Sequence, residues 1–471
     1  MVKRILSAIL GFAITFSVHL FLLPSQSFAN SAETDTKVTT APATPAAAPE
    51  QPAPTIKYID VNANQWFYPY ILKIKGLQHL AQDTPLLKPY EFTTLEEIFT
   101  LLQAQDNDLR SIEEALAKSK TSKLLDENAD LHKTATREDL YTAVGRYYGI
   151  ETVNKLFEDT ANVYANGFLE KNIITPLAQN NKFVFSPTRP VSRAEAIVLI
   201  EKAKLFKTDA KSFSAITQKP VYLPILIYHE ITEDKEKLSK SGSLFVSPSK
   251  FTQDVQTFQK NGYSAVTFEE VKAFMDGYVS IPEKPYVITF DDGYKGNHTY
   301  AFTIAKENKV KFVVNLVAET IQRPATFSDA YAKNQHLSDK DIWEMHSSGL
   351  VEFQSHTYNL HRSFGETSLG NGVGPFRNEP QLSYSSRLGD DLQRSAGVIR
   401  YLTGYTPCVL TYPMGIYNTL ADELCVRNGF TFTLTTEEGV NNLQNGTTKL
   451  KRINVSNWSV SDALVNAAGK R

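Results

Sequence analysis

The C-terminal half of the chain, from about residue 222 onward, alternates between short apolar runs and amphipathic stretches. The apolar runs are LPILIYH, PYVITFDDG, KFVVNLV, VEFQSHT, CVLTYP and FTFTLTT, and they are separated by helical patterns such as SPSKFTQDVQTFQKNG and LGDDLQRSAGVIRYLTG. Near-continuous apolar strands that alternate with amphipathic helices are typical of a parallel α/β sheet. The number of units predicts a barrel-like closure, in which the functional site lies at the carboxyl ends of the strands.

Polar side chains follow several of these predicted strands. They are His229, the adjacent pair Asp291 and Asp292, His356, His361 and the turn Tyr412-Pro413-Met414-Gly415. Two neighbouring carboxylates are costly to bury unless a positive charge compensates them. One carboxylate and two imidazoles supply three ligands and leave positions for water, as in a catalytic divalent site. An Asp-Asp-Gly alone is more often a turn, and a lone histidine more often structural, but their joint occurrence favours a metal site.

A divalent metal at this edge would lower the pKa of a bound water, and an aspartate that stays free could take the proton. The hydroxide would attack a carbonyl carbon, and backbone N–H groups would help the metal to hold the oxyanion. The leaving amine needs a proton donor, for which His229 is the candidate. Aspartate and imidazole suit zinc, nickel, cobalt or iron, of which we expect zinc.

The N-terminus has the features of an export signal. Lys3 and Arg4 precede an apolar run over residues 5–23, and Ser27-Phe28-Ala29 forms a small-x-small cleavage pattern. This pattern predicts that residues 1–29 are a secretory signal peptide. An uncleaved anchor is the alternative. Residues 30–56, which include APATPAAAPEQPAPT, are expected to form an extended linker. No later stretch approaches about 18 apolar residues, so we expect a secreted protein without a transmembrane segment in its mature form. The formal net charge of −2 gives no reason to expect a nucleic-acid partner.

Residues 57–205 carry a repeated pattern. Thr94-Leu95-Glu96-Glu97, Thr136-Arg137-Glu138-Asp139 and Ser192-Arg193-Ala194-Glu195 each predict a capped helix start before an apolar run. The repetition favours a small all-α repeat module, and it resembles S-layer homology (SLH) repeats, which hold exported proteins to cell-wall polysaccharide. An anionic polymer needs a cationic partner, and Arg137 and Arg193 are the candidates. The alternative is a purely structural helical domain.

The motifs TFDDGY, SHTYNLH and TYPMG resemble, in that order, those of the polysaccharide deacetylase family, carbohydrate esterase family 4. The resemblance assigns residues 222–471 to a deacetylase domain. It implies a distorted, incomplete (β/α) barrel with a divalent metal that removes acetyl groups from glycans. It also implies that Asp291 is the general base and that Asp292, His356 and His361 are metal ligands. The spacing of the two histidines and the Tyr228-His229 pair resemble the branch that acts on poly-N-acetylglucosamine, in which the histidine that matches His229 is the general acid.

The chain departs from the family pattern at two places. Thr411 stands where many members have an arginine that braces the base, and KLKRINVSNW stands where other branches have Leu-x-His. The bracing group and the oxyanion donor, expected within residues 412–415, therefore stay open. Three tyrosines near the motifs are candidates for stacking on sugar rings: Tyr294, Tyr358 and Tyr412. The glycine-rich FGETSLGNGVGPF after His361 reads as a loop near the site.

The expected function is that of a wall-tethered, metal-dependent deacetylase that acts on N-acetylglucosamine units of a cell-surface polysaccharide. Peptidoglycan or an O-acetylated xylan is an alternative substrate, and a glycan-binding surface protein that no longer catalyses is an alternative class. Cys408 and Cys425 are the only cysteines. In an exported protein they could form a disulfide or remain two structural thiols.

Overall fold

The structure, a computed structural model, describes residues 58–81, 84–214, 219–239, 244–321, 336–361 and 372–470. The predicted signal peptide and the predicted linker lie outside the described residues, as does most of the glycine-rich stretch after His361. Among the helices of the described residues, none combines the length and the apolarity that a membrane crossing requires.

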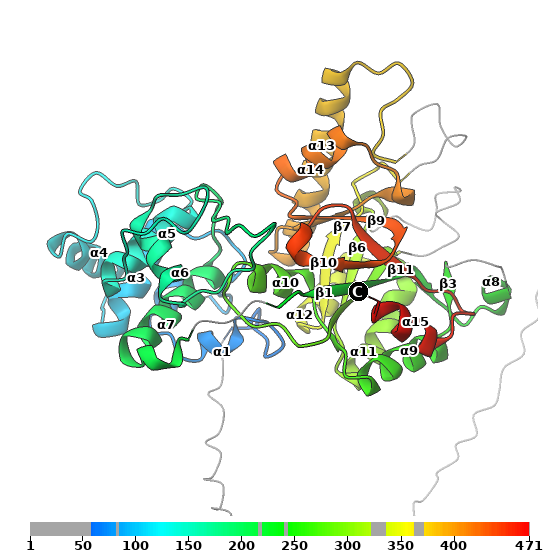
Figure 1. The fold of residues 1–471 in the computed structure, drawn as a ribbon, viewed down its shortest axis with the longest axis horizontal. Coiled ribbons are helices and arrows are strands. Elements are labelled where there is room, and N and C mark those ends of the chain that lie inside the picture. Colours follow the sequence, from blue (N-terminus) through cyan, green and yellow to red (C-terminus); the bar gives the residue numbers. More distant parts are fainter. Residues whose placement is uncertain are drawn as a thin grey trace, which may run out of the picture. The chain divides into compact units, whose positions relative to one another are not determined.

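Seven parallel strands close into a barrel in the C-terminal part of the chain (Figure 1). They are β1 (Tyr222–Tyr228), β5 (Pro285–Asp292), β6 (Phe312–Leu316), β7 (Val351–Ser355), β8 (Val409–Thr411), β9 (Phe432–Glu438) and β11 (Leu450–Asn454). The strands are paired in the order β1-β11-β9-β8-β7-β6-β5, and the sheet closes because β5 also pairs in parallel with β1. The predicted α/β barrel is thus confirmed. The region that contains it, residues 222–470, is called the barrel region below.

One barrel strand was missed by the sequence analysis. Strand β11 lies within KLKRINVSNW, a stretch whose charges conceal its strand character. In the structure Lys451 is exposed whereas its neighbour Arg452 is fully buried, as the two-residue period of a strand allows. Two short strands extend the barrel sheet, since β4 (Ser264–Ala265) pairs with β5 and β10 (Val440–Asn442) with β1. Strands β2 (Glu230–Ile231) and β3 (Phe245–Val246) form a separate two-stranded sheet.

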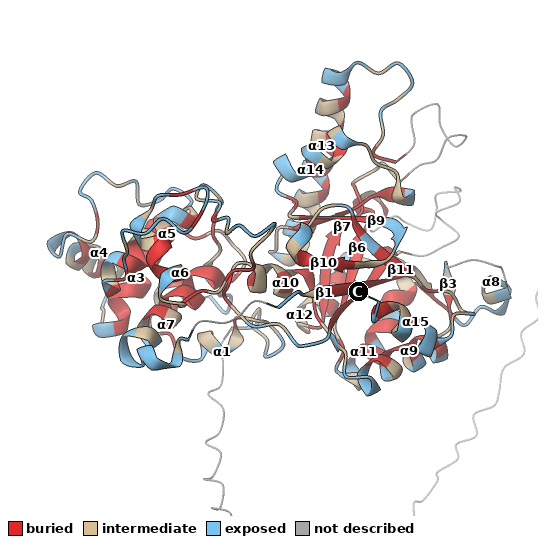
Figure 2. Ribbon diagram, in the orientation of Figure 1, coloured by how far each residue is buried: buried red, intermediate tan, exposed pale blue. Residues whose placement is uncertain are grey.

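Helices surround the strands, whose residues are largely buried (Figure 2). They are α8 (Lys235–Ser239), α9 (Pro248–Lys260), α10 (Phe268–Met275), α11 (Thr303–Asn308), α12 (Asp339–Ser347), α13 (Gln381–Thr403), α14 (Thr419–Arg427) and α15 (Ser461–Ala468). Helix α9 begins where the sequence indicates, because Ser247 accepts a hydrogen bond from the Lys250 N–H and a proline follows the cap. Phe251 and Phe258 on its inner face join a core cluster with Phe290 of β5.

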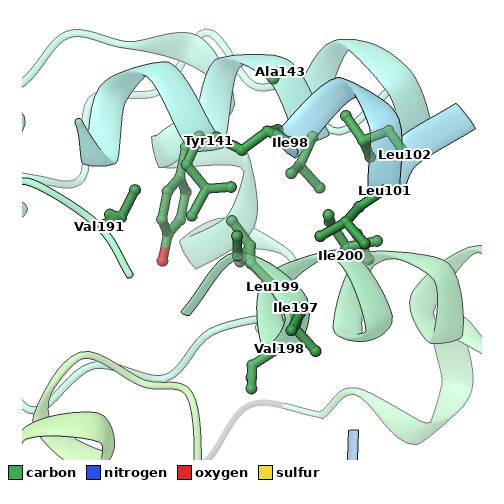
Figure 3. Close-up of a cluster of buried hydrophobic side chains, with 14 of the residues drawn as sticks. Ile98, Leu101, Leu102, Tyr141, Ala143, Val191, Ile197, Val198, Leu199 and Ile200 are labelled. Atoms are coloured by element: carbon green, nitrogen blue, oxygen red, sulfur yellow. The ribbon is translucent and has the colours of Figure 1, made fainter. Parts of the chain in front are cut away.

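Residues 58–213 form a helical region around a hydrophobic core to which Ala273 and Tyr278 of the barrel region also contribute, and part of this core is drawn in Figure 3. Its helices are α1 (Tyr68–Ile71), α2 (Leu77–Ala81), α3 (Leu95–Asp106), α4 (Ile112–Thr121), α5 (Arg137–Tyr148), α6 (Val163–Glu170) and α7 (Arg193–Thr208). All three predicted caps form: Thr94, Thr136 and Ser192 each accept a hydrogen bond from the N–H three residues on. The predicted helical region ahead of the barrel is therefore present.

The segments that lead into the three capped helices are joined to one another in a ring. The N–H of Thr93 donates to the carbonyl of Val191 (2.9 Å), that of Val191 to Ala135 (3.1 Å), and that of Ala135 to Thr93 (2.9 Å). Asp60 and Asp159 make equivalent contacts, since the carboxylate of each accepts hydrogen bonds from two successive backbone N–H groups about 27 residues further along the chain. Contacts repeated in this way indicate internal repetition in the helical region.

The two arginines predicted to hold an anionic polymer are engaged inside the protein. Arg137 is 2% exposed, and its Nη1 lies 2.7 Å from Oδ1 of Asp276. Arg193 donates to both carboxylate oxygens of Glu97, at 3.0 and 2.5 Å. Each guanidinium thus has a carboxylate partner within the chain, and the role of the two arginines in binding a polymer stays a prediction. Asp276 follows α10, so its pair with Arg137 joins the helical region to the barrel region.

Both cysteines are free and buried, which answers the question that the sequence left open. Cys408 belongs to a buried cluster formed largely by residues of the barrel strands, and Cys425 to another that includes residues of α13. Burial raises the pKa of each thiol to about 12, so both stay protonated and unreactive near neutral pH.

Candidate active site

The two adjacent aspartates occupy the carboxyl end of β5, where the sequence analysis put them. Both are buried, and Asp292 has a left-handed backbone with φ 72°, which aspartate tolerates better than most residues. The next residue must be glycine. Gly293 has φ 74°, and a Cβ there would lie 2.7 Å from a methyl group of Leu316. The tight turn therefore ends the strand directly after the second carboxylate.

Asp292 meets both histidines of the SHTYNLH motif. Its Oδ1 lies 3.2 Å from Nε2 of His361 and 3.5 Å from Nε2 of His356. One ligand atom from each of the three residues lies within 4.8 Å of the other two. The same Oδ1 is buried and has no hydrogen-bond partner among the described residues. A buried, unsatisfied carboxylate oxygen beside two imidazole nitrogens fits a divalent cation.

The orientation of His356 is set by its second nitrogen. Nδ1 lies 2.8 Å from the carbonyl oxygen of Thr411, so Nδ1–H donates there and the Nε2 lone pair points towards Asp292. Burial lowers the pKa of His356 to about 4, which keeps the imidazole neutral. A neutral imidazole held in this way is the form that binds metal.

Asp291 has a different environment. Its Oδ1 and Oδ2 each accept a hydrogen bond from Arg452, both at 2.9 Å, and Oδ1 also accepts one from Asn315 (2.7 Å). Burial by itself would raise the pKa of Asp291, but the Arg452 guanidinium, with His356 and His229, holds it well below its usual range. Asp291 is therefore ionised and fixed in orientation, as a proton acceptor must be.

Arg452 answers the question raised by Thr411, where the sequence lacks the expected bracing arginine. The bracing cation comes from β11 instead, and its Nη1 and Nε also donate to Thr289 and to the carbonyl of Thr435. The signal available in the sequence was one arginine in a short alternating stretch next to Ile453. This pattern alone does not predict that Arg452 contacts Asp291, because the contact depends on the pairing of β11 with β1.

His229 follows β1 on the same side of the barrel. Its carbonyl accepts a hydrogen bond from Asn297 (2.8 Å), which holds the backbone at this point. Its buried Nδ1 has no partner among the described residues. His229 is among the groups that lower the pKa of both Asp291 and Asp292. All five residues predicted for the chemistry thus lie at one edge of the barrel.

The turn after β8 only partly fits its predicted role. The Tyr412 side chain is fully buried, where it donates to Asp422 (2.6 Å) and stacks on Tyr417, and its N–H donates to Leu434. We therefore correct the prediction for Tyr412, which serves the core rather than the substrate. The remainder, Pro413–Gly415, forms a 3₁₀ turn in which Met414 has φ 57° and is 37% exposed. Gly415 is required there, because a Cβ would lie 2.1 Å from Thr436 Oγ1.

The other predicted aromatic residues have neighbours of their own. Tyr294 stacks on His336 with ring centroids 5.1 Å apart. Tyr358 lines an open groove of about 720 Å³ between the loop after β7 and α13. Two further histidines of the barrel region lie in helical segments: His298 lies 3.2 Å from Glu344, and His346 is partly buried.

Helix α13 supports the loop that carries the two histidines. The carboxylate of Asp391 accepts hydrogen bonds from the N–H groups of Tyr358 (2.8 Å) and Asn359 (2.9 Å). One turn further along, Ser395 Oγ lies 2.7 Å from Ser355 Oγ, which accepts from the N–H of Thr357. Thr357 has φ 74°, a strained conformation for a β-branched residue. The helix therefore holds a strained turn between His356 and His361.

Comparison with known proteins finds a family that the part of the chain around this site resembles. Residues 279–433 match the family described as polysaccharide deacetylase. The Bacillus subtilis (strain 168) protein YxkH, named for the same family, is 27% identical over 250 residues, which are 53% of this chain and 77% of that protein. The poly-beta-1,6-N-acetyl-D-glucosamine N-deacetylase of Escherichia coli (strain K12) is 26% identical over 212 residues. The match covers 42% of this chain but only 32% of that relative.

Two solved structures are also similar. The Streptococcus pyogenes deacetylase PplD in complex with acetate is 24% identical, with a TM-score of 0.44 over 54% of this chain and all of that one. IcaB from Ammonifex degensii is 22% identical, with a TM-score of 0.42 over 52% of this chain and 95% of that one. Residues 279–433, which contain Asp291, Asp292, His356 and His361, are thus similar to the polysaccharide deacetylase family.

Proposed function

We propose that the chain is a metal-dependent deacetylase that hydrolyses the N-acetyl groups of N-acetylglucosamine units in a cell-surface polysaccharide. The observation that supports this most directly is the cluster of Asp292, His356 and His361 beside a braced, ionised Asp291. The name of the Escherichia coli relative supports the choice of N-acetylglucosamine.

The donor set fits a divalent ion, with Asp292, His356 and His361 as its ligands and zinc as the first choice over nickel, cobalt or iron. Such an ion would supply Lewis acidity to water and to the acetyl carbonyl. Asp291 accepts the proton of the attacking water, and Arg452 keeps that carboxylate ionised and oriented. His229 gives a proton to the amine nitrogen as the C–N bond breaks, so that acetate and a free amine leave.

We further propose that the protein is exported and held at the cell surface. The signal-like residues 1–29 support export, and the internal repetition of the helical region supports attachment by repeats of the SLH kind. Attachment would raise the effective concentration of the barrel near an insoluble substrate.

The experiment is acetate release from N-acetylglucosamine hexasaccharide, with O-acetylated xylan and peptidoglycan as alternative substrates. We expect release from the hexasaccharide, its loss after thorough chelation and its return with added zinc. Asp291→Asn should lose turnover yet keep bound metal, whereas Asp292→Asn should lose the metal. Activity that survives complete metal removal would falsify the mechanism, and release from xylan or peptidoglycan alone would exclude the proposed substrate.

A further inference from the structure

A cleft lies between the helical region and the barrel region, apart from the metal ligands. It has a volume of about 1110 Å³, slightly above the usual range for ligand sites. Residues of the helical region, such as Tyr70 and Lys202, line one wall, and residues of the barrel region, such as Tyr263 and Phe274, line the other. None of the residues proposed for deacetylation is among its lining residues.

The walls of the cleft are aromatic. Tyr70, Phe213, Tyr222, Tyr263 and Phe274 line it and are all partly exposed. Aromatic rings with a polar edge offer both a flat apolar face and a hydrogen-bonding group. A sugar ring has the complementary character, with C–H groups on its faces and hydroxyl groups around its rim. The lining therefore fits an oligosaccharide better than a purely apolar ligand.

The cleft also has an excess of positive charge. Lys202, Lys219 and Lys284 line it, against the single carboxylate of Glu283. Lys202 is the most informative of them, because its Nζ donates only to the carbonyls of Gly277 (3.0 Å) and Tyr278 (3.1 Å). Burial lowers the pKa of Lys202 to about 8, and no carboxylate of the described residues offsets that burial. Unlike Arg137 and Arg193, this cation has no anionic partner within the described protein.

We propose that the cleft between Lys202 and Lys284 binds a short stretch of an acidic oligosaccharide, with its carboxylates at the lysines and its rings on the aromatic walls. The choice of an acidic oligosaccharide rests on the proposal that the protein is attached to a cell-surface polymer. The cleft, rather than Arg137 and Arg193, would then bind that polymer. This binding does not depend on deacetylation, because the cleft shares no residue with the metal cluster.

The test uses the full protein and two probes, a hexamer of galacturonic acid and the neutral cellohexaose, with binding measured by calorimetry. We expect the acidic hexamer to bind and cellohexaose to bind at least tenfold more weakly. Lys202→Gln should weaken binding of the acidic hexamer about tenfold, as expected for one charged hydrogen bond. Lys202→Arg should retain that binding, and Lys306→Gln, an exposed change on α11 away from the cleft, should leave it unchanged.

Acetate release from N-acetylglucosamine hexasaccharide, measured on the same variants, shows that they are folded and tests the deacetylase proposal separately. The cleft proposal is overturned if the acidic hexamer does not bind, if cellohexaose binds as well, or if Lys202→Gln binds the acidic hexamer like the unchanged protein. Loss of acetate release with intact binding would instead count against the deacetylase alone.

Discussion

At the scale of single residues, Arg452 decides the state of the proposed base. It is fully buried, and its two terminal nitrogens meet the two oxygens of Asp291. A planar guanidinium can make this bidentate contact, whereas a lysine ammonium interacts as a point charge. The orientation of Asp291, as distinct from its charge, therefore depends on arginine.

Arg452→Lys tests this dependence. We expect kcat for acetate release to fall at least tenfold while KM and bound metal stay nearly unchanged, because the charge remains but the bidentate geometry is lost. Kinetics on the hexasaccharide and metal analysis measure these effects. Arg427→Lys, on the surface of α14, is the matched control. A variant with normal kcat would show that Asp291 needs no bracing.

At the scale of elements, α13 acts as a support for the loop that carries the histidines. Asp391 and Ser395 lie four residues apart, hence on one face of the helix, and both contact the segment from Ser355 to Asn359. Groups that orient metal ligands without touching the metal commonly affect affinity by 10- to 100-fold. The adjacent Asp390 is exposed and offers an unusually close control.

Asp391→Asn should weaken metal binding about tenfold, because an amide supplies one acceptor oxygen where the carboxylate supplies two for the N–H groups of Tyr358 and Asn359. Titration of the metal-free protein with zinc measures the change. Asp390→Asn should bind zinc as the unchanged protein does. Equal affinities for the two variants would contradict a supporting role of α13.

At the scale of the whole molecule, two glutamates lie where the helical region meets the barrel region: Glu352 is buried and Glu269 is partly buried. Glu269 accepts a hydrogen bond from Trp66 Nε1 (2.5 Å), and its own N–H donates to Glu352 (2.9 Å). Burial, reinforced by the neighbouring carboxylate, raises the pKa of Glu269 to about 8, and burial raises that of Glu352 to about 7. The nearby Lys311 pairs with Glu270 instead. Glu269 and Glu352 therefore keep their protons at pH values at which free glutamates, with a pKa of about 4.3, are ionised.

The sign of the pH effect follows from this difference. Between about pH 4 and 8 the folded chain binds more protons than the unfolded chain, so the free energy of unfolding falls as the pH rises through this range and levels off above about pH 8. Glu269→Gln should reduce the decrease in the free energy of unfolding between pH 6 and 9 by roughly 1–3 kcal/mol, because a neutral amide replaces the carboxyl group that ionises. Urea unfolding midpoints across this range measure it, with the exposed Glu307→Gln as control. An unchanged pH profile in the Glu269 variant would refute the assignment.

Local patterns in the sequence determined much of this molecule. The alternation of apolar and amphipathic stretches indicates a parallel barrel, and the carboxyl ends of parallel strands meet at one edge, so His229, Asp291, Asp292, His356 and His361 could be assigned to one site. The three capped helix starts could be read in the same way, because a cap depends on residues only three apart.

Contacts between distant segments were decided by the tertiary structure alone. Arg452 lies 161 residues from Asp291, and Arg137 lies 139 residues from Asp276. A guanidinium binds equally well to any carboxylate or anionic polymer that reaches it, so the sequence near each arginine carries no record of its partner. Only the closure of β11 against β1, and the packing of α5 near α10, determined which anion each arginine meets.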